Sequence, residues 1–249
     1  MVYDYSQDEV GPLQDRTLSA SPSKPSRAKR APSAPTSRDQ TLARVLWPVY
    51  ILFRPRVFFE SLAMLHAPSL TFSCAMMFGM SNTIDRVSNK MGTTGISVPW
   101  ETSWGAFWGF VVGAGAVSAA LTYVIGGWWY RRRLRWCGVA DPDKKVSTRI
   151  YVCAAQVFAT PSVLMTAIAG SVFATPLEAA ESDAATIWGL ISIVLVLWSF
   201  AVSYIGVRTV FAARVWPARI WFLILPVGFV IAMVVIGLGL LIAFDPEAP

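Results

Sequence analysis

Five long apolar runs dominate this 249-residue chain. None of them has an Asp, Glu, Lys or Arg at its centre, and their approximate bounds are 65–84, 104–129, 150–174, 186–207 and 220–244. At a rise of about 1.5 Å per residue, a helix of about 20 residues crosses a bilayer core of about 30 Å. The sequence therefore predicts an all-α fold, namely a polytopic membrane helix bundle with five transmembrane helices.

The composition supports a bilayer rather than water as the surrounding solvent. Hydrophobic residues make up 55% of the chain and charged residues only 14%, whereas soluble domains carry about a quarter charged residues. The net charge of +6 comes from basic residues that lie beside the apolar runs and not in a separate polar domain. We therefore expect a lipid bilayer with anionic lipids as a partner, and no nucleic acid.

The distribution of basic residues predicts how the chain is oriented. Nineteen of the 21 Lys and Arg residues precede the first run or lie in the segments 130–149 and 208–219, and only Arg86 and Lys90 lie elsewhere. Lys and Arg accumulate on the cytoplasmic side of membrane proteins. This indicates a cytoplasmic N-terminus and, with an odd number of spans, a C-terminus on the outside.

The chain divides into three predicted parts. Residues 1–41 are rich in Ser, Pro, Lys and Arg and predict a disordered basic tail. Residues 42–64 mix short apolar clusters with charges and predict an interfacial amphipathic segment, in which Pro55 begins a helix that turns Phe58 toward lipid. Residues 65–245 form the five-span membrane domain.

Few residues in the chain are suited to catalysis or metal binding. His66 is the only histidine, the three cysteines show no C-x-x-C spacing, and no nucleophile, phosphate-loop or zinc motif is present. Asp141 and Asp143 could hold a divalent cation, but the intervening proline and the following lysines favour a turn. We expect no catalytic site, no cofactor and no metal.

Small residues recur along one face of the second apolar run. Gly105, Gly109 and Gly113 are spaced by four residues, and small residues allow membrane helices to approach closely. We expect this face to pack against another span of the same chain. Homo-oligomerisation is the alternative.

A proline interrupts the third run. Pro161 follows Gln156 and Thr160, and a proline within a helix frees a carbonyl and bends the helix. The polar kink is expected to be structural. Alternatively, it lines a polar cavity at mid-membrane depth for a passive solute.

The strongest surface feature is a basic cluster on the predicted cytoplasmic side. It can contact anionic lipid or a protein partner, although topology alone would also require it. Its members are Arg131, Arg132, Arg133, Arg135, Lys144, Lys145 and Arg149.

The order of these features resembles the Yip family (Ypt/Rab-interacting proteins), over roughly residues 45–245. The matching positions are Pro55, Phe58 and Phe59, the glycine-rich second run, the basic loop before Tyr151, then Pro161, Trp188, Gly206, Arg208, Ala212, Ala213 and Pro217. Eukaryotic members carry a D-L-Y-G-P type motif before the first span, where this chain has His66-Ala67-Pro68-Ser69-Leu70. The chain therefore looks more like the bacterial members, which implies the bacterial cytoplasmic membrane rather than an endomembrane.

Two functions follow as expectations. The first is a noncatalytic scaffold or adaptor in membrane organisation or trafficking, which contacts membrane-protein partners or assembles as a homo-oligomer. The second is a small passive channel or facilitator, with a polar mid-membrane cavity near Gln156, Thr160 and Pro161.

Overall fold

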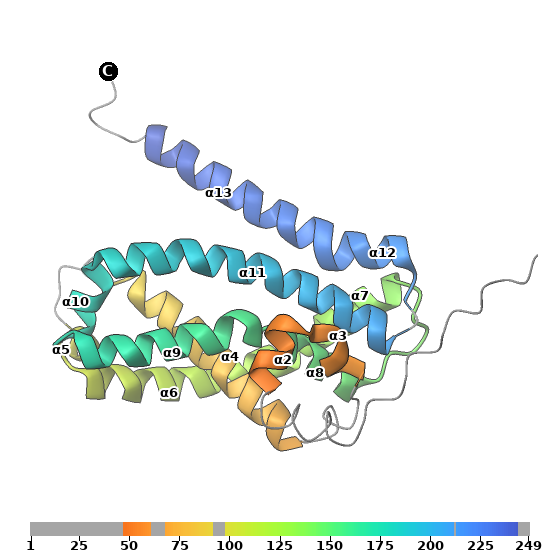
Figure 1. The fold of residues 1–249 in the computed structure, drawn as a ribbon, viewed down its shortest axis with the longest axis horizontal. Coiled ribbons are helices and arrows are strands. Elements are labelled where there is room, and N and C mark those ends of the chain that lie inside the picture. The colour runs from red at the N-terminus through yellow and green to blue at the C-terminus, as the bar shows by residue number, and fades with distance from the viewer. Residues whose placement is uncertain (1–46, 61–67, 92–97, 212, 244–249) are drawn as a thin grey trace, which may run out of the picture. The chain divides into compact units, whose positions relative to one another are not determined.

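The computed structural model describes residues 47–60, 68–91, 98–211 and 213–243, and every regular element within them is a helix (Figure 1). The predicted all-α fold is confirmed. The predicted tail over residues 1–41, His66 and the C-terminal end lie outside the described residues. In chain order, the helices are α2 (Trp47–Phe53), α3 (Pro55–Glu60), α4 (Pro68–Ser88), α5 (Pro99–Thr102), α6 (Trp104–Leu121), η2 (Thr122–Gly126), α7 (Gly127–Trp136), α8 (Lys144–Ala154), α9 (Gln156–Val172), α10 (Pro176–Glu181), α11 (Asp183–Val210), α12 (Val215–Arg219), η3 (Ile220–Ile224) and α13 (Leu225–Ala243).

Three continuous helices in the described part of the chain are long and apolar enough to cross a membrane. They cover Trp104–Trp136, Asp183–Val210 and Val215–Gly237, with 33, 28 and 23 residues. Helices α8 and α9 form a fourth candidate if they cross as one span, bent by 46°. The chain is thus a multi-pass membrane protein with three or four such helices by length and composition.

Helix α4 is as long as a span but carries more polar residues than the candidate spans and is not one of them. It has 21 residues, and its most extensive contacts are with α6 and α9. Ser81 and Thr83 are buried, and the Thr83 hydroxyl donates to the Gly79 carbonyl at 2.9 Å. Neighbouring helices therefore bury the Thr71, Ser81 and Thr83 side chains of α4, whereas Asp85, Arg86 and Ser88 near its end are exposed.

The largest cluster of buried hydrophobic side chains connects α2 and α3 with the C-terminal half of the chain. Pro55 begins α3, as predicted, but Phe58 and Phe59 are fully buried where α3 contacts α11. The prediction that Phe58 faces lipid is therefore wrong. A six-residue helix cannot persist alone, so this pair of rings, in edge-to-face contact at 5.2 Å, holds α3 against the bundle.

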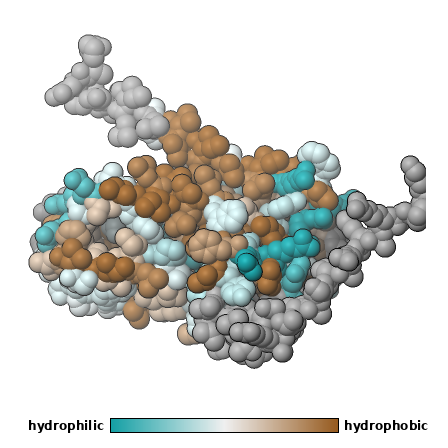
Figure 2. Space-filling model, in the orientation of Figure 1, coloured by the Kyte–Doolittle hydropathy of each residue, from teal (hydrophilic) through white to brown (hydrophobic). Residues whose placement is uncertain are grey.

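The connections between helices gather at two ends of the described structure (Figure 1). At one end α5 contacts α10. At the other, the backbone N–H of Arg214 donates to the Cys137 carbonyl at 2.9 Å, which ties the turn after α7 to the start of α12. The visible face shows hydrophobic residues over α11 and α13 and hydrophilic residues toward both ends (Figure 2). This is the pattern expected of a chain that crosses a bilayer.

Candidate functional site

The basic cluster is built from the last turns of α7, the following turn and the start of α8. Gly138 closes that turn with φ of +86°, a left-handed conformation that favours glycine. A Cβ at this position would also meet the Arg214 side chain at 3.1 Å. The turn therefore brings the basic residues of α7 and α8 together and places Arg214, which sequence reasoning did not include in the cluster, beside them.

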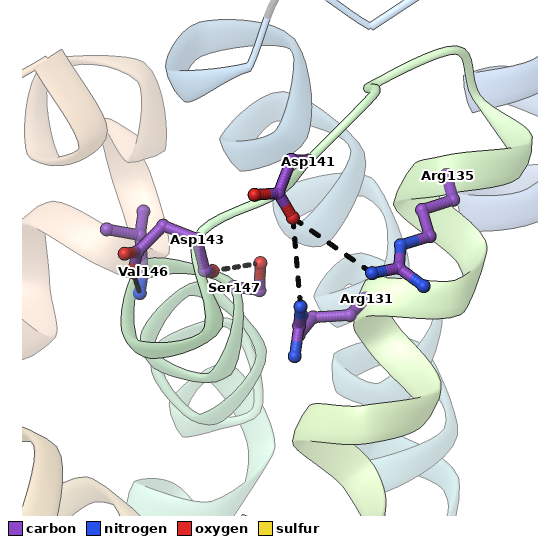
Figure 3. Close-up of polar contacts among 6 residues, drawn as sticks. All are labelled: Arg131, Arg135, Asp141, Asp143, Val146 and Ser147. Atoms are coloured by element: carbon purple, nitrogen blue, oxygen red, sulfur yellow. Dashed lines mark hydrogen bonds and ion pairs between the residues drawn. The ribbon is translucent and has the colours of Figure 1, made fainter.

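Asp141 lies between two arginines of α7 (Figure 3). Its carboxylate is 3.9 Å from an Arg131 nitrogen and 4.0 Å from an Arg135 nitrogen. The two arginines are four residues apart and so share one face of α7. The Asp141 side chain is 89% exposed, so these contacts orient the arginines but add little to stability, about 0–1 kcal/mol.

Asp143 has a different role from Asp141. Its carboxylate accepts a hydrogen bond from the Val146 backbone N–H at 2.8 Å, and its carbonyl accepts from the Ser147 hydroxyl at 2.6 Å. It is thus the N-cap of α8. Within the described residues, no group of three or more His, Cys, Asp or Glu side chains could hold a metal ion.

The predicted basic residues are not equivalent in the structure. The Arg133 guanidinium lies 4.2 Å from the centre of the Phe222 ring and is partly buried, so it packs α7 against η3. Arg131 and Arg149 are half-buried. The four members that remain exposed to a partner are Arg132, Arg135, Lys144 and Lys145.

One thiol lies within the turn. Cys137 is fully buried, and burial raises its pKa to about 11, while the nearby Arg133 charge opposes that rise. The thiol is therefore protonated at neutral pH and is a poor nucleophile. The Cys137 thiol accordingly belongs to the packing of the turn.

The predicted polar kink is present, but its position and cause differ from the prediction. Helix α9 runs through Pro161 without a break, and the 46° bend lies at Ala155. The Gln156 side chain donates to the Val152 carbonyl at 2.9 Å and occupies a place in the backbone ladder. A side chain inserted into this ladder is a known cause of helix bending.

Gln156 also joins two helices. The same Nε2 group donates to the Cys74 carbonyl of α4 at 2.8 Å, and the Thr160 hydroxyl donates to Gln156 Oε1 at 3.2 Å. Gln156 is only 2% exposed. Its amide is therefore committed to hydrogen bonds within the protein and is not presented to a solute.

The small-residue face of α6 does not make the contact predicted for it. Gly105, Gly109 and Gly113 are exposed, and a Cβ at Gly109 or Gly113 would meet nothing within 4 Å among the described residues. The close contact lies on another face, where a Cβ on Gly79 of α4 would be 2.1 Å from the Gly115 carbonyl oxygen. The prediction of packing within the chain is wrong for the three glycines, and a contact with a second copy stays a prediction.

Comparisons with known proteins return no relative. No model of a protein family matches the chain, and neither a characterised protein nor a solved structure matches it.

Proposed function

We propose that this chain is a noncatalytic, five-span membrane protein that acts as a scaffold or adaptor through its basic end. The observation that carries the proposal is the exposed cationic surface formed by Arg132, Arg135, Lys144 and Lys145. Asp143 is occupied as a helix cap, so Asp141 is the acidic side chain that faces the cluster.

The fifth span in this proposal is α4. Its contacts with both α6 and α9 explain how a helix with a polar second half is tolerated in a bilayer. Counting α4, successive connections would alternate between the basic end and the opposite end, as the distribution of Lys and Arg requires. This arrangement has a cytoplasmic N-terminus and an external C-terminus, and agrees with the resemblance to bacterial members of the Yip family.

The residues that suggested a passive facilitator are bonded to other groups of the protein. Gln156 is buried and hydrogen-bonded to two backbone carbonyls, and Thr160 is bonded to Gln156. A pore at this level would have to form without these side chains. We therefore favour the scaffold.

The number of spans is tested by the location of the C-terminus. Fusion of alkaline phosphatase after Pro249 should give high phosphatase activity in intact bacteria, whereas fusion of green fluorescent protein should give little fluorescence. The reason is that phosphatase folds only outside and the fluorescent protein folds in the cytoplasm. The reverse pattern would mean an even number of spans and would remove α4, or another helix, from the set.

The adaptor role is tested by removing the four exposed charges together. The full chain with Arg132, Arg135, Lys144 and Lys145 replaced by Gln is purified in mild detergent at native abundance beside the unaltered protein. We expect a stoichiometric membrane-protein partner with the unaltered chain and its loss, by tenfold or more, with the variant, because each cation near an anionic surface contributes about 1 kcal/mol.

A matched variant controls for the general loss of charge. Arg54, between α2 and α3, and Arg56 of α3, which pairs with Glu60 at 2.8 Å, are also exposed basic residues. Replacing both by Gln removes two positive charges outside the cluster. This variant should retain the partner, and all three proteins should unfold at the same temperature. A homo-oligomer without any partner, or equal loss in both variants, would contradict the adaptor role of the cluster.

A further inference from the structure

A cavity opens between α4 and α6, away from the basic cluster. Its volume is about 520 Å³, which is within the usual range for small-molecule sites. Helix α4 and the turn after it contribute Asn82, Arg86 and Lys90, and α6 contributes Phe110, Val117 and Leu121. The cavity thus has one strongly basic wall and one apolar wall.

The two cations share one side of the cavity. Arg86 lies in the last turn of α4 and Lys90 in the turn that follows it, and both residues line the cavity. The neighbouring Asp85 does not line the cavity, and its carboxylate accepts a hydrogen bond from Asn89 at 3.4 Å. Glu101 on α5 is buried and does not line it either. Among the described residues that line the cavity, the charged side chains are the two cations Arg86 and Lys90.

The apolar wall is long and open. Phe110 is 40% exposed, Val117 62% and Leu121 56%, and all three lie along α6. From Phe110 to Leu121 the helix rises by about 16 Å. Trp100 stacks on Phe110 with ring centres 4.8 Å apart, which closes the wall at the end nearer α5.

The cations lie toward one end of this wall. Gly79 of α4 lies against Gly115 and Ala119 of α6, and the chain of α4 then runs on past Arg86 to the turn that holds Lys90. Because α4 and α6 run in opposite directions, Arg86 and Lys90 lie nearer to Trp100 and Phe110 than to Leu121. A ligand that matches this surface has an anionic group at one end and a long apolar body.

We propose that the cavity binds one anionic phospholipid, with its phosphate at Arg86 and Lys90 and an acyl chain along Phe110, Val117 and Leu121. This inference goes beyond the scaffold function, because it places a lipid site on the opposite side of the membrane from the basic cluster. It also gives a role to the two basic residues that depart from the general charge asymmetry of the chain.

The test is native mass spectrometry of the full chain, released from detergent with phosphatidylglycerol or with the neutral phosphatidylcholine. The unaltered protein should retain one phosphatidylglycerol with at least tenfold preference. Joint replacement Arg86→Gln and Lys90→Gln should remove that preference, since two contacts of about 1 kcal/mol correspond to roughly thirtyfold in affinity. The matched control removes two charges at the other end of the chain, with Arg132→Gln and Lys145→Gln, and should retain the lipid.

A second variant tests the acyl-chain wall. Ala114 also lines the cavity and is half-buried, so Ala114→Phe should fill it and weaken phosphatidylglycerol binding without removing a charge. Inorganic phosphate at millimolar concentration should not displace the lipid if the apolar wall contributes. Displacement by phosphate alone, unchanged binding in Ala114→Phe, or equal retention of phosphatidylcholine would overturn the proposal.

Discussion

Replacing Gly79 by Ala should cause the largest loss of stability of any single methyl group added to the described helices. An ideal Cβ would lie 2.1 Å from the Gly115 carbonyl oxygen and 2.7 Å from the Ala119 backbone nitrogen. Both are backbone atoms, so the clash is relieved only when α4 and α6 move apart. Overpacking usually costs about 1–3 kcal/mol, and we expect the upper end of that range or failure to fold. Thermal unfolding in mild detergent, followed by tryptophan fluorescence, measures it.

Gly115 and Gly109 of α6 should tolerate an added methyl group better than Gly79 of α4, each to a different degree. A Cβ on Gly115 would meet Met80 atoms at 3.0–3.1 Å, so Gly115→Ala should cost less than Gly79→Ala. Gly109 has open space around it, so Gly109→Ala, and even Gly109→Leu, should leave the unfolding temperature unchanged or raise it slightly. If Gly109→Ala is the damaging substitution and Gly79→Ala is tolerated, the packing face of α6 is the one that the sequence pattern first indicated.

The error over this face has a simple physical origin. Phe107, Val111, Gly115 and Ala119 recur every four residues, as do Gly105, Gly109 and Gly113. In a soluble helix, polar residues would mark which of the two faces points outward. In α6 both faces are small or apolar, so the choice depends on Gly79, which is far away in sequence. A single helix pattern does not contain that information.

The local features were more predictable. Pro55 begins α3, as predicted, because the rule for a proline at the first helical position involves only neighbouring backbone groups. The sequence predicts a turn at Asp141 and Asp143, and Asp143 is the N-cap of α8, which begins before the predicted start of the third run at about residue 150. The basic residues of α7 and α8 also lie close together because only a short turn separates these two helices in the sequence. The sequence did not indicate that members of the basic cluster have different environments: Arg133 packs on Phe222, whereas Arg132 is exposed.

The position of the bend between α8 and α9 was also not predictable from the local sequence. Proline rules predict a kink before Pro161, whereas the observed break lies beside Gln156, whose side chain donates to the carbonyl of Cys74, 82 residues away in sequence. Helix α4 is a related case. Its composition makes it the least apolar of the long helices, so it is not among those apolar enough to cross a membrane, and its contacts with α6 and α9 depend on residues far away in sequence.

Gln156→Leu should therefore destabilise the protein without changing solute permeability. Leucine cannot donate, so the Cys74 and Val152 carbonyls, now bonded at 2.8 and 2.9 Å, would lose a buried partner. Hydrogen bonds between membrane helices contribute about 0.6–2 kcal/mol each, so a loss of about 2 kcal/mol is expected, together with a straighter junction between α8 and α9. Thermal unfolding in detergent measures the first effect.

Thr160→Val is the matched control for this substitution. It removes only the 3.2 Å hydrogen bond to Gln156 Oε1 and leaves both backbone carbonyls paired, so it should cost less than about 1 kcal/mol. Solute flux in proteoliposomes should be the same for both variants and the unaltered chain, because the Gln156 amide is committed to the junction of α4, α8 and α9. A Gln156→Leu protein of unchanged stability but altered flux would instead place Gln156 on a solute path, and the facilitator would replace the scaffold as the function to pursue.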